Sequence, residues 1–254
     1  MNPRQTFRIL IINPNSSEAI TAAIVASIDR MQLGHSMELS AYTTPQPSPL
    51  SITSYSDIKI SEETVYSRIS KDGPTLAHYD AVLIAGFGTK SLVSKLSNLG
   101  PECIMGVFEA SILTAQTLLR PDSNDKWGII TLDHFWESYL MVEVKSFLGQ
   151  DKNSSNDRFA GVFSAKSYSP DPNAISQEDM KNGIREATGQ LLQSSSARCV
   201  VIGCIVTAEL EDIVRSTATE FLGKRMGEAL YVIDAIKAGI LKIQQMVRCR
   251  DTFK

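Results

Sequence analysis

The chain carries one eight-residue pattern twice: Val82-Leu83-Ile84-Ala85-Gly86-Phe87-Gly88-Thr89 and Val200-Val201-Ile202-Gly203-Cys204-Ile205-Val206-Thr207. The two copies lie 118 residues apart (204 − 86 = 118), and the runs Ile11-Ile12-Asn13 and Ile129-Ile130-Thr131 show the same offset. One match between short apolar runs is common by chance, but two matches in a single register indicate a duplicated lobe.

Other short apolar runs alternate with stretches in which apolar residues recur every three or four positions. We expect strands at 7–13, 37–42, 81–85, 127–131, 159–163, 199–203 and 229–234, and helices at 17–31, 109–119, 137–148, 177–194 and 235–247. This alternation predicts an α/β fold with parallel sheets flanked by helices, and the repeat predicts that it forms two similar lobes. We expect residues 1–105 and 222–254 to form the first lobe and residues 106–221 the second.

Composition narrows the class of protein. The chain of 254 residues is 43% hydrophobic and 21% charged, which is typical of a globular protein. The net charge is −3 and the Lys and Arg residues are scattered, so we expect no nucleic-acid partner. No apolar run is long enough for a membrane span and the N-terminus resembles no signal peptide, which predicts a cytoplasmic protein that does not bind membranes. The four cysteines lack metal-ligand spacing, which predicts no metal site.

The ends of four expected strands, near Asn13, Gly86, Thr131 and Cys204, are candidates for one ligand cleft, because parallel sheets bind ligands at the carboxyl ends of their strands. Cys204 follows a strand at the point where a helix is expected, and a helix N-terminus favours the thiolate form. The alternative is that Cys204 is simply a buried residue at the end of a strand.

Three neighbouring segments have two interpretations each. The turn Asn13-Pro14-Asn15-Ser16-Ser17-Glu18 can hold a carboxylate or imide through free backbone N–H groups, or it can only cap the next helix. His134, beside Asp133, can enter the cleft or lie in solvent. The proline-rich loop at 43–56 is either a lid or an ordinary surface loop.

Four motifs together resemble the hydantoin and allantoin racemase family of the Asp/Glu racemase superfamily, and its fungal members most of all. The motifs are Ile9-Leu10-Ile11-Ile12-Asn13-Pro14-Asn15-Ser16-Ser17, Gly106-Val107-Phe108-Glu109-Ala110, Gly128-Ile129-Ile130-Thr131 and Val201-Ile202-Gly203-Cys204. The resemblance runs from about Phe7 to Val247. It implies two similar α/β lobes related by a pseudo-twofold axis, each with a parallel, four-stranded type of sheet. It also implies no cofactor, and one cysteine from each lobe on opposite sides of a small substrate.

In such enzymes one thiolate removes the α proton and the other thiol returns one. The resemblance makes Cys204 the catalytic cysteine of the second lobe. It also implies that Asn15, Ser16, Ser17 and Thr131 bind carbonyl or carboxylate groups of the substrate. Because relatives commonly assemble, a homo-oligomer is one expected state.

The sequence departs from the family pattern at the first catalytic cysteine. Where the family reads Ala-Cys-Phe-Gly, this chain reads Ala85-Gly86-Phe87-Gly88, and glycine has no side chain to carry a proton. After Cys204, Ile205 and Val206 replace smaller residues usual in the family. We therefore expect a modified pocket lined by Phe87, Gly88, Thr89, Ile205 and Val206.

These observations predict a cofactor-independent racemase or epimerase that acts at an acidic carbon next to a carbonyl, in a hydantoin-like or amino-acid-derived substrate. Such an enzyme needs a substitute for the missing thiol, such as water, Thr89 or His134. One alternative is a single-cysteine decarboxylase or one-base isomerase resembling arylmalonate decarboxylase, and another is an inactive family member that binds a small molecule. If the pocket is otherwise intact, Gly86→Cys should create or enhance racemase activity.

Overall fold

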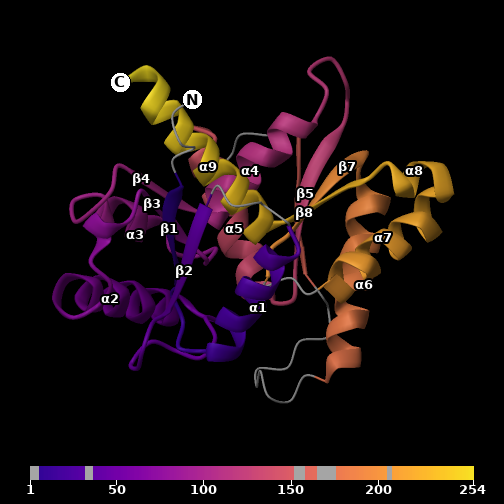
Figure 1. Ribbon diagram of the computed structural model, residues 1–254. Helices are drawn as coiled ribbons and strands as arrows, with labels where there is room; N and C mark the ends of the chain where they lie inside the picture. Colours follow the sequence, from indigo (N-terminus) through magenta and orange to yellow (C-terminus); the bar gives the residue numbers. More distant parts are fainter. Residues whose placement is uncertain (1–5, 32–36, 152–157, 165–175, 205–207) are drawn as a thin grey trace. The chain divides into compact units, whose positions relative to one another are not determined.

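The computed structural model describes residues 6–31, 37–151, 158–164, 176–204 and 208–254, in two compact units (Figure 1). The first unit comprises Met1–Ala110 and Ile236–Lys254, and the second comprises Ser111–Ala235. The chain passes from the first unit to the second within helix α4 (Val107–Leu118) and returns at the start of helix α9 (Ala235–Phe253).

The first unit contains a four-stranded parallel sheet with strand order β2-β1-β3-β4. Its strands are β1 (Phe7–Asn13), β2 (Met37–Thr43), β3 (Ala81–Ile84) and β4 (Cys103–Gly106). Its helical elements besides α9 and the start of α4 include α1 (Glu18–Asp29), α2 (Tyr55–Lys71), the 3-10 helix η2 (Leu76–His78) and α3 (Lys90–Leu96).

Both faces of the first sheet are buried. Leu10 and Ile12 of β1 face the side covered by α2 and α3, where they pack with Val65, Ile69, Leu92 and Leu96. Ile9 faces the opposite side, where α9 supplies Ile243 and Val247. Figure 1 shows α9 lying alongside this sheet. Burial on both faces explains why β1 reads as a continuous apolar run rather than an alternating one.

The second unit repeats this topology with strand order β6-β5-β7-β8, again all parallel. Its strands are β5 (Lys126–Thr131), β6 (Phe159–Ser164), β7 (Ala197–Ile202) and β8 (Tyr231–Asp234). Its helices besides the end of α4 include α5 (His134–Phe147), α6 (Gln177–Ser194), α7 (Ala208–Leu222) and α8 (Lys224–Glu228).

Helices cover the two faces of the second sheet differently. Ile130 and Ile202 pack against α6 and α7, which lie side by side in Figure 1, through Ile184, Leu191 and Val214. The other face is covered by α5. A β-carbon built at Gly203 would lie 2.9 Å from Cγ2 of Ile129 and 3.7 Å from Cδ1 of Leu140, so these three residues share the α5 face.

The two central strands of each sheet match at the offset seen in the sequence. Ile12 pairs with Ile84 in the first sheet, and Ile130 pairs with Ile202 in the second (130 − 12 = 118; 202 − 84 = 118). The next backbone bond repeats as well: the Ala85 amide donates to the Ile12 carbonyl at 2.9 Å, and the Gly203 amide donates to the Ile130 carbonyl at 2.8 Å. The shared register supports the duplicated lobe inferred from the sequence.

The boundaries between the units differ from those expected at 105/106 and 221/222. Ile202 of β7 pairs with Asp234 of β8, so residues 222–235 belong to the second unit and only α9 returns to the first. Because Tyr231–Asp234 is a short strand directly followed by a helix, the sequence does not show which sheet it joins.

Several elements were absent from the sequence-based assignment, among them β4, α2 and α3. Strand β4 has four residues and ends in glycine, which makes its apolar signal too short to recognise. Helix α2 buries Ser61, Glu62 and Thr64 along with Ile58 and Val65, so polar residues interrupt its apolar face. Helix α3 has only seven residues.

Candidate active site

The carboxyl end of β1 is held together by the side chain of Asn13, which is 1% exposed. Its Nδ2 atom donates to Oδ1 of Asn15 at 3.0 Å, to the Ser17 carbonyl at 3.1 Å and to Oγ1 of Thr21 at 2.9 Å. A buried amide with this many partners fixes the path of the turn that follows the strand. Asn13 therefore acts as a structural anchor between β1 and α1.

The backbone amides of this turn are already occupied. The Asn15 amide donates to Oδ1 of Asn13 at 3.3 Å, the Ser16 amide to the Pro49 carbonyl at 2.9 Å, and the Ser17 amide to Oδ1 of Asn15 at 3.0 Å. The expectation of free N–H groups here is wrong, because side chains and the following loop satisfy them. The Ser17 hydroxyl caps α1 by accepting from the Ile20 amide at 3.3 Å, so the capping interpretation holds for this residue.

The proline-rich loop packs directly against the same turn. Oγ of Ser48 donates to the Pro14 carbonyl at 2.6 Å, and Thr44 donates to the Asn13 carbonyl through both its amide and its hydroxyl. Ser48 and Thr44 are fully buried. The loop is thus an integral part of the edge on which the predicted residues Asn15 and Ser16 lie.

Gly86 follows β3 and lies against Pro14. A β-carbon at this position would lie 2.6 Å from Cγ of Pro14 and 3.4 Å from Oγ1 of Thr89. Thr89 is buried, and its hydroxyl donates to the Gly86 carbonyl at 3.2 Å. The ring of Phe87, also buried, makes an edge contact with Phe108 at a centroid distance of 6.2 Å. The proline ring therefore occupies the space in which a first cysteine would begin.

Cys204 is half-buried two residues beyond β7, at the carboxyl edge of the second sheet. It packs against the apolar cluster that contains Ile130 and Ile202. Burial, together with the negative charge of nearby Asp234, raises the pKa of the Cys204 thiol to about 12. The expectation of a thiolate stabilised by a helix N-terminus is therefore wrong: desolvation dominates, and the thiol keeps its proton at neutral pH.

The remaining cysteines give no second reactive thiol at this edge. Cys103 and Cys199 are buried, and Cys249 is exposed on α9. Burial raises the pKa of the Cys199 thiol to about 12 as well. Cys204 is thus distinguished by its position at a strand end rather than by its acidity.

A polar cluster at the ends of β5 and β6 was only partly anticipated. The Ser164 hydroxyl lies 2.8 Å from Nδ1 of His134 and donates to the Glu137 carboxylate, while Nδ1 lies 3.3 Å from Oε2 of Glu137. The sequence singled out His134 but not its partners. Glu137 lies one helical turn further along α5, and Ser164 becomes its neighbour only through the pairing of Thr131 with Ser164. Asp133 accepts from the Phe135 amide at 2.7 Å and caps α5.

The other predicted site residues have simple positions. Thr131 ends β5 and is 1% exposed, and Gly88 is buried beside Phe87. Ile205 and Val206 lie outside the described residues. The structure thus groups the predicted residues at the carboxyl edges of the two sheets, each within its own unit.

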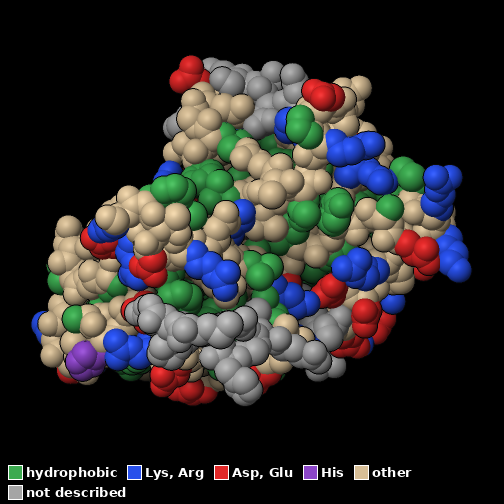
Figure 2. All heavy atoms as spheres, turned by 45° about the horizontal axis from the view of Figure 1, so that its top comes forward, with side chains coloured by type: hydrophobic (Ala, Val, Ile, Leu, Met, Phe, Trp, Pro, Cys, Tyr) green, Lys and Arg blue, Asp and Glu red, His purple; other side chains and the backbone are tan. Residues whose placement is uncertain are grey.

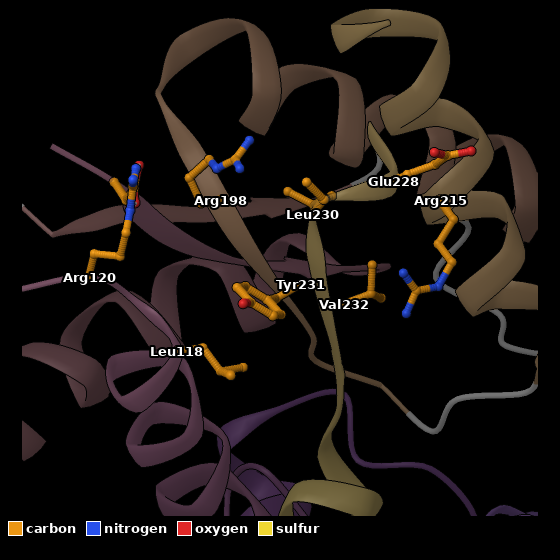
Figure 3. A pocket seen from close by; sticks show the side chains of 10 residues that line it. Leu118, Arg120, Arg198, Arg215, Glu228, Leu230, Tyr231 and Val232 are labelled. Atoms are coloured by element: carbon orange, nitrogen blue, oxygen red, sulfur yellow. The ribbon is translucent and has the colours of Figure 1, made fainter. Parts of the chain in front are cut away.

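An open pocket of about 540 Å³ lies at the other end of the second sheet. Arg198 and Tyr231, near the amino-terminal ends of β7 and β8, line it together with Arg120 and Arg215. Figure 3 shows Tyr231 and Val232 between Arg120 on one side and Arg215 on the other. Arg120 pairs with Asp125 and Arg215 with Glu211, so two of these three arginines already have carboxylate partners. This pocket is separate from the edge that carries Cys204.

Figure 2 shows Lys, Arg, Asp and Glu side chains interspersed over the face that it displays. Within the described ranges, no group of three His, Cys, Asp or Glu side chains is placed to hold a metal ion. None of the helices in that part of the chain is both long and apolar enough to cross a membrane.

Comparison with known proteins supplies the wider context. A protein of Schizosaccharomyces pombe, described as uncharacterized, is 24% identical over 241 residues, which cover 95% of this chain and 92% of that protein. Among solved structures, allantoin racemase from Klebsiella pneumoniae aligns with a TM-score of 0.67 at 21% identity, covering 96% of this chain and 89% of that chain. An aspartate racemase homologue from Pyrococcus horikoshii OT3 aligns with a TM-score of 0.53 at 13% identity, covering 96% and 100%.

The two structural matches agree with the α/β fold of two similar four-stranded parallel sheets. The model of the family described as Asp/Glu/Hydantoin racemase matches residues 9–243, which include every described strand end discussed above. The chain therefore belongs to the Asp/Glu/hydantoin racemase family.

Proposed function

We propose that this protein is a cofactor-independent isomerase that moves a proton at an acidic carbon next to a carbonyl. The observation that carries the proposal is the half-buried Cys204 thiol at the carboxyl edge of the second sheet, where parallel α/β sheets bind their ligands. Family membership supports the class of reaction. The structural likeness to allantoin racemase from Klebsiella pneumoniae supports a hydantoin-like or amino-acid-derived substrate.

The role of Cys204 in this proposal follows from its surroundings. Because burial keeps its proton in place at neutral pH, Cys204 acts first as an acid that protonates the carbanion-like intermediate. The contacts that hold the substrate stay a prediction: Asn15, Ser16, Ser17, Phe87, Gly88, Thr89, Thr131, Ile205 and Val206.

The test measures proton exchange and inversion separately. The single enantiomers of 5-methylhydantoin and allantoin are incubated in D₂O with the protein, loss of the C5 proton signal is followed by NMR, and inversion is followed by circular dichroism. We expect Cys204→Ser to lower the rate of inversion by about 10²- to 10⁴-fold, the usual contribution of a positioned acid or base. Cys249→Ser is the matched control, because Cys249 is an exposed thiol on α9. Equal inversion rates for both variants would refute a catalytic Cys204.

A second candidate is a single-thiol decarboxylase. It is favoured by the combination of a protonated Cys204 with a glycine at position 86, because loss of carbon dioxide creates the carbanion without any base. Phenylmalonate labelled in one carboxyl group provides the probe. Release of labelled carbon dioxide that depends on Cys204, with no exchange of either hydantoin, would replace the isomerase proposal by this one.

A further inference from the structure

The proposed isomerase needs a base as well as an acid, and the second unit contains a candidate that the proposal has not used. This candidate is the hydrogen-bonded cluster of Ser164, His134 and Glu137 at the carboxyl ends of β5 and β6. Ser164 is 2% exposed, whereas the His134 side chain is 61% exposed. The cluster thus combines a buried hydroxyl, which anchors it to β6, with an imidazole that reaches solvent.

The contacts determine which nitrogen of His134 carries the hydrogen. The Ser164 hydroxyl has a single hydrogen, which it donates to the Glu137 carboxylate. The contact of 2.8 Å between Oγ of Ser164 and Nδ1 of His134 then requires Nδ1 to donate. A neutral imidazole with its hydrogen on Nδ1 has a free lone pair on Nε2. This arrangement orients the ring and leaves Nε2 able to accept a proton.

His134 and Cys204 lie on opposite faces of the second sheet. Phe163 and Cys204 both pack against the cluster under α6 and α7. Successive residues of a strand point to opposite faces, so Ser164 faces α5, and its bonds to His134 and Glu137 agree with that direction. A ligand over the carboxyl edge would therefore have the imidazole on one side and the thiol on the other.

The strand that holds His134 through Ser164 and the strand that leads to Cys204 both pair with β5. Ser164 is paired with Thr131, and the pairing of Ile130 with Ile202 places Gly203 at the same level, so β6 and β7 flank β5 at this edge. Adjacent strands are about 4.8 Å apart, so β6 and β7 are separated by about 10 Å. A carbon that reacts with a group on each side needs about 3.5 Å to each, or about 7 Å in total. The two strands are therefore close enough for one small substrate to reach groups held by both.

We infer that His134 is the second acid/base group of the proposed isomerase and takes the place of the missing first cysteine. The inference rests on the proposed function. Nε2 of His134 accepts the proton from the substrate carbon, and the electron pair of the broken C–H bond moves onto the adjacent carbonyl to give an enolate. Cys204 then donates its thiol proton to the opposite face of that carbon. The enzyme is left with an imidazolium and a thiolate, which catalyse the reverse inversion or regain the first state by proton exchange with water.

The environment of each group supports this assignment of roles. A thiol whose pKa lies at about 12 is a poor base at neutral pH, so another group must remove the first proton. At the imidazole, Oε2 of Glu137 lies 3.3 Å from Nδ1, and β6 contributes the neutral Ser164 hydroxyl at 2.8 Å. Both contacts involve Nδ1, so they orient the ring and leave Nε2 for the substrate.

The decisive experiment uses enantiomers, because a base on one face serves only one of them. The wild-type protein should exchange the C5 proton of both (R)- and (S)-5-methylhydantoin in D₂O and interconvert them. Cys204→Ser should lose inversion in both directions but keep exchange from one enantiomer, because His134 remains as the base on that face. His134→Gln should lose exchange from that same enantiomer by about 10²-fold or more and should also lose inversion in both directions. His78→Gln is the matched control, because His78 is an exposed histidine of the first unit.

The outcomes distinguish a failure of the inference about His134 from a failure of the proposed function. If the wild-type protein exchanges and inverts both enantiomers and His134→Gln does the same, the inference about His134 is overturned while the proposed function stands. An equal loss of exchange from both enantiomers in Cys204→Ser would leave His134 without any activity as a base and would also overturn the inference. If the wild-type protein exchanges neither enantiomer of 5-methylhydantoin or allantoin, the proposed function fails and the inference falls with it.

Discussion

Adding a single methyl group at position 86 should destabilise the protein through one identified contact. In Gly86→Ala the new β-carbon would lie 2.6 Å from Cγ of Pro14, about 1 Å closer than a normal carbon–carbon contact. Pro14 cannot easily move, because its carbonyl accepts hydrogen bonds from Ser48 and Ser61, both fully buried. Overpacking of this kind costs about 1–3 kcal/mol, which corresponds to a Tm lower by about 2–12 °C for a chain of this size.

A double-mutant cycle isolates the contact. Urea denaturation followed by circular dichroism gives the free energy of unfolding of the wild type, Gly86→Ala, Pro14→Ala and the double variant. In the Pro14→Ala background Cγ is absent, so the cost of Gly86→Ala should fall to within about 0.5 kcal/mol of zero. The reasoning is refuted if Gly86→Ala is as stable as the wild type, or if its cost is the same in both backgrounds.

The same contact changes the meaning of restoring a cysteine at this position. Gly86→Cys alone brings the same β-carbon against Pro14, so its failure to enhance racemisation would not test the catalytic geometry. The informative variant is the pair Pro14→Ala with Gly86→Cys, compared with Pro14→Ala alone in the enantiomer assay. We expect the added thiol to increase inversion only in the paired variant.

Three further predictions concern the anchor, the thiol and a helix cap. Asn13→Ala removes one donor group shared by three acceptors in a buried turn and should lower the free energy of unfolding by about 2–4 kcal/mol in urea denaturation, whereas a change below about 0.5 kcal/mol would contradict its role as anchor. Because the pKa of Cys204 is raised from 9.0 to about 12, its alkylation by iodoacetamide, followed by mass spectrometry, should be slow at pH 7 and increase up to pH 12. The free energy of unfolding that this group contributes is present below pH 9 and lost between pH 9 and 12. Faster alkylation of Cys204 than of the exposed Cys249 at pH 7 would show that the thiol is not desolvated. Ser176→Ala breaks the capping box with Asp179 at the start of α6 and should cost about 1 kcal/mol in the same denaturation assay, and an unchanged midpoint would mean that the cap does not form.

The repeated motif explains why much of the fold could be predicted. Val82–Thr89 and Val200–Thr207 share a sequence register, and Ile84 and Ile202 keep that register in their pairing with β1 and β5. The strands form long apolar runs, which can be recognised in the sequence, because both faces of each sheet are covered. Strand β4 and helix α2 could not be recognised, since the first is only four residues long and the second buries Ser61 and Glu62 among its apolar residues.

The candidate site was predictable as a set of positions but not as chemistry. The sequence places Cys204 after a strand, yet the direction of its pKa shift depends on burial and on Asp234, which is thirty residues further along and adjacent only through β8. Likewise, the amides of Ser16 and Ser17 looked free because their acceptors, the Pro49 carbonyl and the Asn15 side chain, are set by the folded loop and turn. Ser164 could not be linked to His134 without the register between β5 and β6.

The way in which α9 completes the first unit determines the order in which the chain can fold during synthesis. Ile243 and Val247 leave the ribosome after the whole of Ser111–Ala235, so the second unit can reach its native packing while the surface of Ile9, Ala81 and Cys103 is still uncovered. A nascent chain with such a bare apolar surface is a substrate for chaperones and prone to aggregate. The first unit, whose synthesis starts first, is therefore the last to complete its native packing.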